Sequence, residues 1–254
     1  MSAPIITIDG PVASGKGTVA RRVAEALHFH LLDSGAIYRA HAQACLSKKI
    51  DFNKINILEH EARVLSLKFF GEKVWLNGMD ATADVRSEAM GMAASTLSAI
   101  PEIRAALMQR QRDFAVAPGL VADGRDMGTV VFPAATLKIY LTATAQVRAE
   151  RRATQVAGQQ PAAGAPAPAK QLIEKGKSPT IVGSLETIQA HMPLEVEDTL
   201  RRDVEAQIRQ RDWQDKSRAI APLKPATDAI VIDNAAHSPD ETAAAILRLW
   251  QLRF

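Results

Sequence analysis

A glycine-rich stretch near the start of the chain has the residue types and spacing of a phosphate-binding loop. It reads G-P-V-A-S-G-K-G-T and contains the frame G-x-x-x-x-G-K. Glycines let successive backbone N–H groups turn toward an anion, and a helix that begins there adds the positive end of its dipole. The loop predicts a phosphoryl donor, ATP, held by Gly10, Pro11, Val12, Ala13, Ser14, Gly15, Lys16, Gly17 and Thr18.

The residues after the loop lysine narrow the class of enzyme. A simple Walker A loop has Ser or Thr directly after the lysine, whereas Gly17 stands there in this chain and Thr18 follows. Mg²⁺ prefers oxygen ligands and keeps several waters, so we expect Thr18 and Asp123 to hold it mostly through water. No Asn-Lys-x-Asp sequence occurs, which argues against a switch GTPase.

Widely separated arginines could supply the positive charge that transfer to a second anion requires. Both substrates of a phosphoryl transfer are negatively charged and must be brought together. Arg39, Arg125 and Arg218 are candidate clamps on the acceptor phosphate, although an isolated arginine is usually a solvated surface charge. Asp33 and Asp123 are carboxylates near the point of transfer, and no side chain stands out as a general base.

Composition excludes several other classes of protein. The chain has 254 residues, 31 Lys and Arg against 28 Asp and Glu, and only 5% aromatic residues, so we expect no nucleic-acid partner. Cys45 is the only cysteine, which rules out an intrachain disulfide and is typical of a buried small hydrophobe. Without a secretory signal or an 18-residue apolar stretch, we expect a cytoplasmic protein with no membrane partner.

The elements that must position these residues alternate between strands and helices. Pro4–Asp9 is a short β-branched run, as expected of a strand buried in a parallel sheet. Further strands are predicted at His30–Leu32, Gly119–Ala122, Thr136–Leu141 and Ala229–Ile232. Helices are predicted after Gly17, from Asp33 to about Lys48, and over Pro239–Leu252. This rhythm predicts an α/β protein with the P-loop NTPase fold, a parallel sheet flanked by helices.

The middle of the chain departs from this rhythm. Ser66–Phe70 and Lys73–Leu76, followed by the Asn77-Gly78 turn, predict a small antiparallel piece. Helical stretches follow at Arg86–Ala99 and Pro101–Val116, so a subdomain is inserted in the core. Ala157–Lys170 is rich in Ala, Pro and Gly, and it is interpreted as a linker.

Three further stretches resemble sequences of a known family. They are Leu31–Arg39 (L-L-D-S-G-A-I-Y-R), Ala122–Pro133 (A-D-G-R-D-M-G-T-V-V-F-P) and Arg211–Leu223 (R-D-W-Q-D-K-S-R-A-I-A-P-L). With the loop, in which Ala13 replaces a glycine of the family pattern, they look like bacterial cytidylate kinase. The resemblance covers most of the chain outside residues 156–197. It implies a nucleoside monophosphate kinase of pyrimidine metabolism that uses ATP and Mg²⁺ to phosphorylate CMP or dCMP, and we expect a monomer.

The resemblance also implies a base-binding site and a ribose-binding site. Asp126 would accept a hydrogen bond from the amino group of cytosine, while Arg104 and Ser95 would donate to the base. Ser95 could equally belong to a packed helix face. Arg211 and Asp215 would reach the ribose hydroxyls, with an ion pair along a helix as the alternative.

The remaining implied roles concern the substrate site and a lid. Ser34 would belong to the substrate site, and Arg148 and Arg152 would lie in a lid that closes over ATP, with a solvated helix face as the alternative. The expected division is a core of about residues 1–39, 105–146 and 218–254, a monophosphate-binding subdomain at 40–104, and a lid region at 147–217. Rival hypotheses are a uridylate- or shikimate-type kinase, or a non-catalytic nucleotide-binding module.

Overall fold

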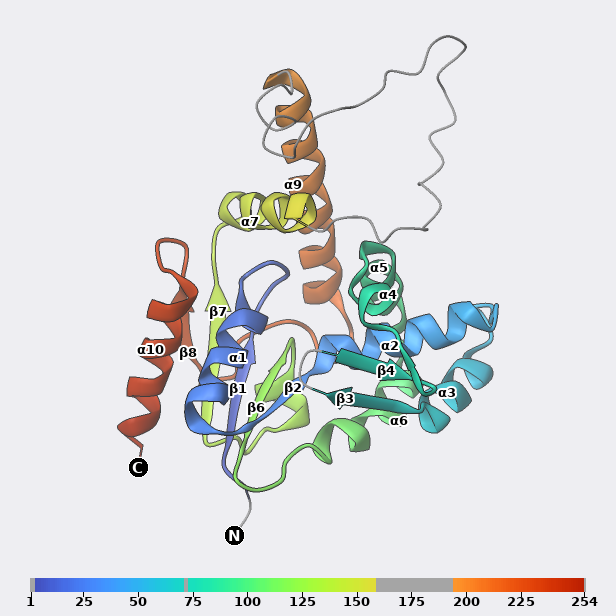
Figure 1. Cartoon of the computed structure of the whole chain (residues 1–254), viewed down its shortest axis with the longest axis horizontal. Helices are drawn as coiled ribbons and strands as arrows, with labels where there is room; N and C mark the ends of the chain where they lie inside the picture. The colour runs from blue at the N-terminus through green and yellow to red at the C-terminus, as the bar shows by residue number, and fades with distance from the viewer. Residues whose placement is uncertain (1–2, 71–72, 159–193, 254) are drawn as a thin grey trace.

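The computed structural model describes residues 3–70, 73–158 and 194–253. Within these residues, the central sheet has five parallel strands in the order β2-β6-β1-β7-β8 (Figure 1). The strands are β1 (Ile5–Asp9), β2 (His30–Asp33), β6 (Leu120–Gly124), β7 (Leu137–Thr142) and β8 (Ile230–Asp233). All five were predicted, and their ends differ from the prediction by no more than two residues.

Parallel pairing brings the carboxyl ends of the strands to one edge of the sheet. Asp9 lies opposite Gly124 in the β1–β6 pair, and Asp33 lies opposite Asp123 in the β2–β6 pair. The loop after β1, the start of the helix after β2 and the Arg125-Asp126 segment after β6 therefore share that edge. Ligands of open α/β sheets bind there.

Helices cover both faces of the sheet. On one face, α1 (Lys16–Leu27) and α10 (Pro239–Gln251) pack on a core that includes Ile6, Ile8 and Val121. Leu120 and Ala122 point to the opposite face, because side chains alternate along a strand. There they pack in the core formed with α2 (Ser34–Ser47) and α6 (Pro101–Arg112). The prediction for α6 extended to Val116, four residues too far.

The inserted segment carries a small second sheet. Its elements are α3 (Ile55–Val64), β3 (Leu67–Phe70), β4 (Lys73–Leu76), β5 (Met79–Asp80), α4 (Thr82–Arg86) and α5 (Glu88–Leu97). The antiparallel piece is confirmed, and Asn77 and Gly78 form its turn with left-handed φ angles of 52° and 80°. The helix expected over Arg86–Ala99 is confirmed as α5, whose two ends each differ from the prediction by two residues, whereas α4 was not predicted. Ser87 is extended and separates α4 from α5, and its Oγ accepts from Met90 N at 3.3 Å as the N-cap of α5.

Two helices stand at the carboxyl edge of the sheet, and Figure 1 shows them above the phosphate-binding loop. They are α7 (Ala145–Gly158) and α9 (Leu194–Ser217), which pack together, with Ala149 and Ile208 buried alongside Val12 of the loop. A π-helical turn, η1 (Met127–Val131), follows β6. Residues 159–170 of the predicted linker lie outside the described residues, and Ala157 and Gly158 end α7. Among the described residues, no helix is both long and apolar enough to cross a bilayer.

Candidate active site

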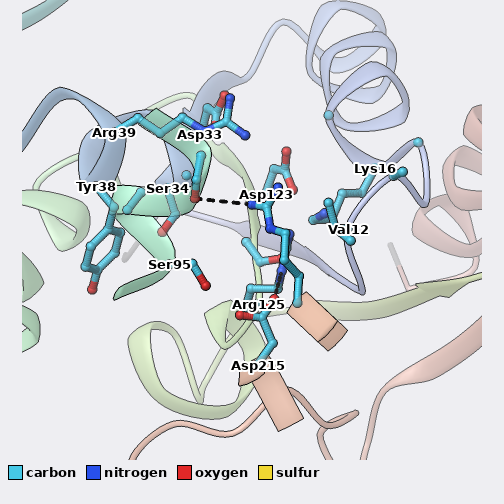
Figure 2. Close-up of a pocket in the computed structure, with 18 of the residues that line it drawn as sticks. Val12, Lys16, Asp33, Ser34, Tyr38, Arg39, Ser95, Asp123, Arg125 and Asp215 are labelled. Carbon is cyan, nitrogen blue, oxygen red and sulfur yellow. Dashed lines mark hydrogen bonds and ion pairs between the residues drawn. The ribbon is translucent and has the colours of Figure 1, made fainter. Parts of the chain in front are cut away.

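A cleft of about 730 Å³ opens at the carboxyl edge of the sheet and brings the predicted site residues together. Figure 2 shows several of them around it, with Lys16 on one side, Asp123 and Arg125 between, and Ser34, Tyr38 and Arg39 on the other. Every predicted donor, substrate and metal residue lines this cleft except Gly10, Pro11, Ser14 and Arg148. The structure therefore brings residues that are far apart in the sequence together in one site.

The phosphate-binding loop is shaped by its small residues. A side chain at Gly10 would collide with the carbonyl of Leu141, and Gly15 has a φ of 85° that side-chain-bearing residues rarely adopt. Ala13 also lies in the left-handed region, with φ 57°, at the position where the family pattern has glycine. The conformation is kept although alanine is less suited to it.

The side chain of Lys16 bonds to the backbone of its own loop. Its side chain is buried, and Nζ donates to the carbonyl of Pro11 at 3.1 Å, so the ammonium group is held across the loop. Burial, together with repulsion from Arg125, lowers the pKa of Lys16 to about 8. A cation desolvated in this way favours a bound anion, as the terminal phosphates of a nucleotide would provide.

Two carboxylates lie beside the loop. Burial raises the pKa of Asp123 to about 6, although Lys16 opposes the shift. Its Oδ1 is buried and has no hydrogen-bond partner among the described residues, and its Oδ2 would lie 3.2 Å from a Cβ built at Gly17. Asp33 caps α2, where its Oδ1 accepts from Ala36 N at 2.9 Å.

The site offers a divalent cation few protein ligands. No group of three or more His, Cys, Asp or Glu residues that could hold a metal occurs in the part of the chain that the structure describes. Asp123 supplies one unsatisfied carboxylate oxygen, and Thr18 is exposed at the start of α1. This set fits Mg²⁺, which is commonly bound by one or two protein oxygens, waters and substrate phosphates.

Arginines converge on the opposite side of the cleft. Asp215 Oδ2 accepts from Arg125 Nε at 2.9 Å, and Asp215 Oδ1 accepts from Arg218 Nη2. Burial, and then repulsion by Arg125 and Arg39, lowers the pKa of Arg211 to about 10. This mutual repulsion among guanidinium groups marks a place where an anion would be stabilised.

A buried ion pair forms the far end of the cleft. Arg104 Nη2 donates to Asp126 Oδ2, and Arg104 Nη1 donates to the carbonyl of Ser98 at 3.2 Å. The Arg104 guanidinium also lies 5.9 Å from the centre of the Tyr38 ring. These contacts fix the orientation of both charged groups, which together present donors and an acceptor to the cleft.

The two predicted serines occupy different positions. Ser34 is buried, and its hydroxyl donates to Gln111 Oε1 at 2.8 Å. Ser95 is half-buried, and its hydroxyl lies 3.5 Å from Gln214 Oε1, a long and weak contact. The roles of both serines in substrate binding stay predictions.

The two predicted lid arginines, Arg148 and Arg152, have different surroundings in the structure. Arg148 is buried beneath the phosphate-binding loop, where it donates to Val12 O at 3.1 Å and to Asp212 Oδ2 at 2.6 Å. It does not line the cleft, so its predicted contact with ATP stays a prediction. Arg152 and its neighbour Arg151 do line the cleft.

Several cleft residues were not predicted from the sequence. Arg151 was not named among the predicted ATP-binding residues, and Tyr38 was quoted only as part of a motif. Asn234 was missed altogether. The available signal was its position directly after β8, because polar residues that follow parallel strands collect at the same edge of the sheet.

Comparison with known proteins agrees with the kind of site that the cleft geometry indicates. The family model described as cytidylate kinase matches residues 6–175 and 192–252. The chain belongs to the cytidylate kinase family. This assignment confirms the resemblance, the P-loop NTPase fold and the class of enzyme, a phosphotransferase.

Relatives in the cytidylate kinase family match over nearly the whole chain. A cytidylate kinase of Ralstonia pickettii (strain 12J) is 44% identical, over 97% of this chain and 91% of that protein. Another from Bordetella bronchiseptica is also 44% identical, over 98% of this chain and 96% of the relative. A third, from Chromobacterium violaceum, is 42% identical over 99% of this chain and 97% of that protein. The similarity therefore extends across the core, the inserted segment and α9.

Proposed function

We propose that the protein transfers the γ-phosphoryl group of ATP to CMP or dCMP, which yields ADP and CDP or dCDP. The observation that carries the proposal is one continuous cleft with two unlike walls. One wall is a phosphate-binding loop with a buried lysine, and the other combines an arginine cluster with a fixed Arg104–Asp126 pair. Family membership supports the same reaction.

The donor wall would bind ATP through the loop. Backbone N–H groups at the start of α1 and Lys16 would face the β- and γ-phosphates, and Arg152 would approach the nucleotide from α7. Bound Mg²⁺ would supply charge neutralisation on the phosphate oxygens. Asp123 and Thr18 would hold it mostly through water, and the buried Oδ1 of Asp123, which has no hydrogen-bond partner among the described residues, is available for this role.

The acceptor wall would hold the monophosphate and its base. Arg39, Arg125 and Arg218 would surround the phosphate, while Arg211 and Asp215 would lie near the ribose. Cytosine presents an amino donor and two acceptors, which complement the carboxylate of Asp126 and the guanidinium of Arg104. Uracil places a carbonyl where cytosine has the amino group, so it would face Asp126 unfavourably.

Catalysis would then depend on positioning and charge rather than on a general base. The clamps hold two polyanions together, and the cations offset the charge that shifts during transfer. Asp33 would act by holding the first turn of α2, which carries Ser34 and leads to Arg39. Operation as a monomer in the cytoplasm stays a prediction.

An acceptor panel tests this proposal. ADP release would be followed in a coupled assay with ATP, Mg²⁺ and each of CMP, dCMP, UMP, AMP and shikimate. We expect CMP or dCMP to exceed the other acceptors in kcat/KM by at least about 100-fold. A preference for UMP or shikimate would contradict the proposal, and binding of ATP and CMP without turnover would favour the non-catalytic module.

A further inference from the structure

We infer that Asn234 is a positioning residue that sets the phosphate-binding loop for the donor nucleotide; this inference rests on ATP as the donor of the proposed function. Asn234 follows β8 at the carboxyl edge of the sheet and is only 3% exposed. Its backbone N–H donates to Thr142 O at 2.9 Å, which anchors it to the neighbouring strand β7. The backbone of Asn234 is therefore tied to the central sheet.

The side chain of Asn234 holds one peptide group of the loop. Its Nδ2 donates to the carbonyl of Ser14 at 2.9 Å. In a trans peptide, the C=O of one residue and the N–H of the next point in opposite directions. Fixing the Ser14 carbonyl therefore also fixes the direction of the Gly15 N–H on the other side of that peptide.

Gly15 requires an external anchor of this kind. It lies at the N-cap of α1 with φ 85° and has no side chain that could restrict its backbone. Glycine populates several backbone regions with little difference in energy, so its peptide could rotate away from the anion-binding conformation. The hydrogen bond from Asn234 opposes that rotation before a phosphate arrives.

The same residue connects the loop to α7. Arg151 Nη1 donates to Asn234 Oδ1 at 3.1 Å, and Arg151 Nη2 donates to the Asn234 carbonyl at 2.7 Å. Arg151 Nη1 also lies 3.4 Å from the Ser14 carbonyl. Because a guanidinium can only donate, Oδ1 must face Arg151 and Nδ2 must face Ser14. The amide thus satisfies both partners in one orientation, and asparagine is the residue type that does so.

Two substitutions separate this role from simple packing. Asn234→Ala removes both side-chain contacts. Asn234→Asp keeps the acceptor for Arg151 but loses the donor to Ser14 and places a carboxylate oxygen against a carbonyl. If the loop contact matters, both variants should weaken ATP binding, with Asp at least as harmful as Ala. The matched control is Asn53→Ala, an exposed asparagine whose Nδ2 bonds to Asp51 in the inserted segment.

The experiment is calorimetric titration of the wild type and the three variants with ATP and, separately, with CMP. We expect the Kd for ATP to increase by about 10-fold or more in both Asn234 variants. The Kd for CMP should stay within about 2-fold of the wild-type value, and Asn53→Ala should bind both nucleotides like the wild type. The KM for ATP should rise in parallel, and the KM for CMP should not. Thermal unfolding confirms that each variant is folded, and Asn234→Asp serves if Asn234→Ala does not fold.

The outcomes distinguish the inference from the proposed function. Wild-type affinity for ATP in folded Asn234 variants would overturn the inference, as would equal losses of ATP and CMP affinity. If the wild type binds ATP but does not phosphorylate CMP, the proposed function fails while the positioning role is still decided by the ATP titrations. If the wild type binds no ATP, both are overturned.

Discussion

The two walls of the cleft are built in different ways. The donor wall is built on the six residues between β1 and α1 and on the first three residues of α1, and its candidate binding groups are mainly backbone N–H groups and Lys16. The acceptor wall consists of side chains from α2, α5, α6, α9 and the segment after β6. A backbone site can be recognised from one short motif, whereas a side-chain site exists only after distant segments have folded together.

The walls also differ in how their charge is balanced. On the donor wall, the buried Lys16 ammonium group bonds to a carbonyl. On the acceptor wall, Asp215 pairs with two arginines and Asp126 pairs with Arg104. Donor binding should therefore depend on few side chains, while acceptor binding should be sensitive to each member of a network.

The largest effect is expected at Lys16. Lys16→Met removes the buried cation that would bridge the donor phosphates, while the loop backbone stays in place. We expect kcat/KM to fall by at least about 1000-fold, measured by ADP release with saturating CMP. Lys224→Met, at an exposed lysine outside the cleft, is the control and should stay within about 2-fold. A loss below about 10-fold would contradict the role of Lys16.

A large and selective effect is expected at Asp126. Alanine there would leave the buried Arg104 without its partner, so Asp126→Asn is the sharper change. Asparagine keeps the shape but can present a donor where cytosine needs an acceptor. We expect kcat/KM for CMP to fall by about 100-fold, and for UMP to fall much less, with ATP affinity unchanged.

Competition assays with CMP and UMP would measure this ratio directly. Asp51→Asn, an exposed aspartate in the inserted segment, provides the matched control for the loss of a carboxylate. Equal losses for both acceptors, or a parallel loss of ATP affinity, would count against base recognition by Asp126. The result would then indicate a general disturbance of the cleft.

Asp9 connects the two walls and should make stability depend on pH. Its carboxylate accepts from Met127 N and Gly128 N, both at 2.8 Å, and so ties β1 to the turn after Asp126. Burial raises the pKa of Asp9 from 3.8 to about 7, despite these two hydrogen bonds. The folded state therefore binds this proton more tightly than the unfolded state, and the resulting stability is lost as the pH rises from about 4 to 7.

Urea unfolding of the wild type and Asp9→Asn at several pH values tests that sign. The difference in unfolding free energy, wild type minus variant, should decrease between pH 4 and 7 by up to about 1.4 kcal/mol per pH unit. Asp51→Asn should give a difference without this trend. A difference that stays constant or grows with pH would show that Asp9 is ionised throughout the range.

The smallest effect is expected at Ser95. Ser95→Ala removes a hydroxyl whose hydrogen bond to Gln214, at 3.5 Å, is long and weak, so folding should hardly change. If the hydroxyl donates to the base, loss of one neutral hydrogen bond should raise the KM for CMP by about 5-fold and leave the KM for ATP unchanged. Ser47→Ala, a serine bonded to its own helix, is the control. An unchanged KM for CMP would assign Ser95 to helix packing.

The elements that could be predicted from the sequence are those determined by local sequence patterns. The strand–loop–helix unit from β1 to α1 and the Asn77-Gly78 turn could be predicted because propensity and glycine placement determine them. The start of α5 was placed two residues too early, since a serine within a helical pattern becomes a cap only when its backbone is extended. α3 was not predicted, nor was the full length of α9.

The site was predicted unevenly for the same reason. Lys16 and its loop follow from one motif, whereas the acceptor residues were assigned through resemblance to a family. The side-chain contacts of Asn234 with Ser14 and Arg151 could not be predicted, because these partners are 220 and 83 residues away in the chain. The burial of Arg148 under the loop could not be predicted either, because its partner Asp212 lies on another helix.

We propose that one cleft binds ATP on the donor wall and CMP on the acceptor wall. A crystal structure with CMP and a non-hydrolysable ATP analogue would test it most directly. We expect the triphosphate to lie on the loop at Lys16, the cytosine amino group to contact Asp126, and the CMP phosphate to lie among Arg39, Arg125 and Arg218. A base bound away from Asp126 and Arg104, or a CMP phosphate remote from these arginines, would contradict it.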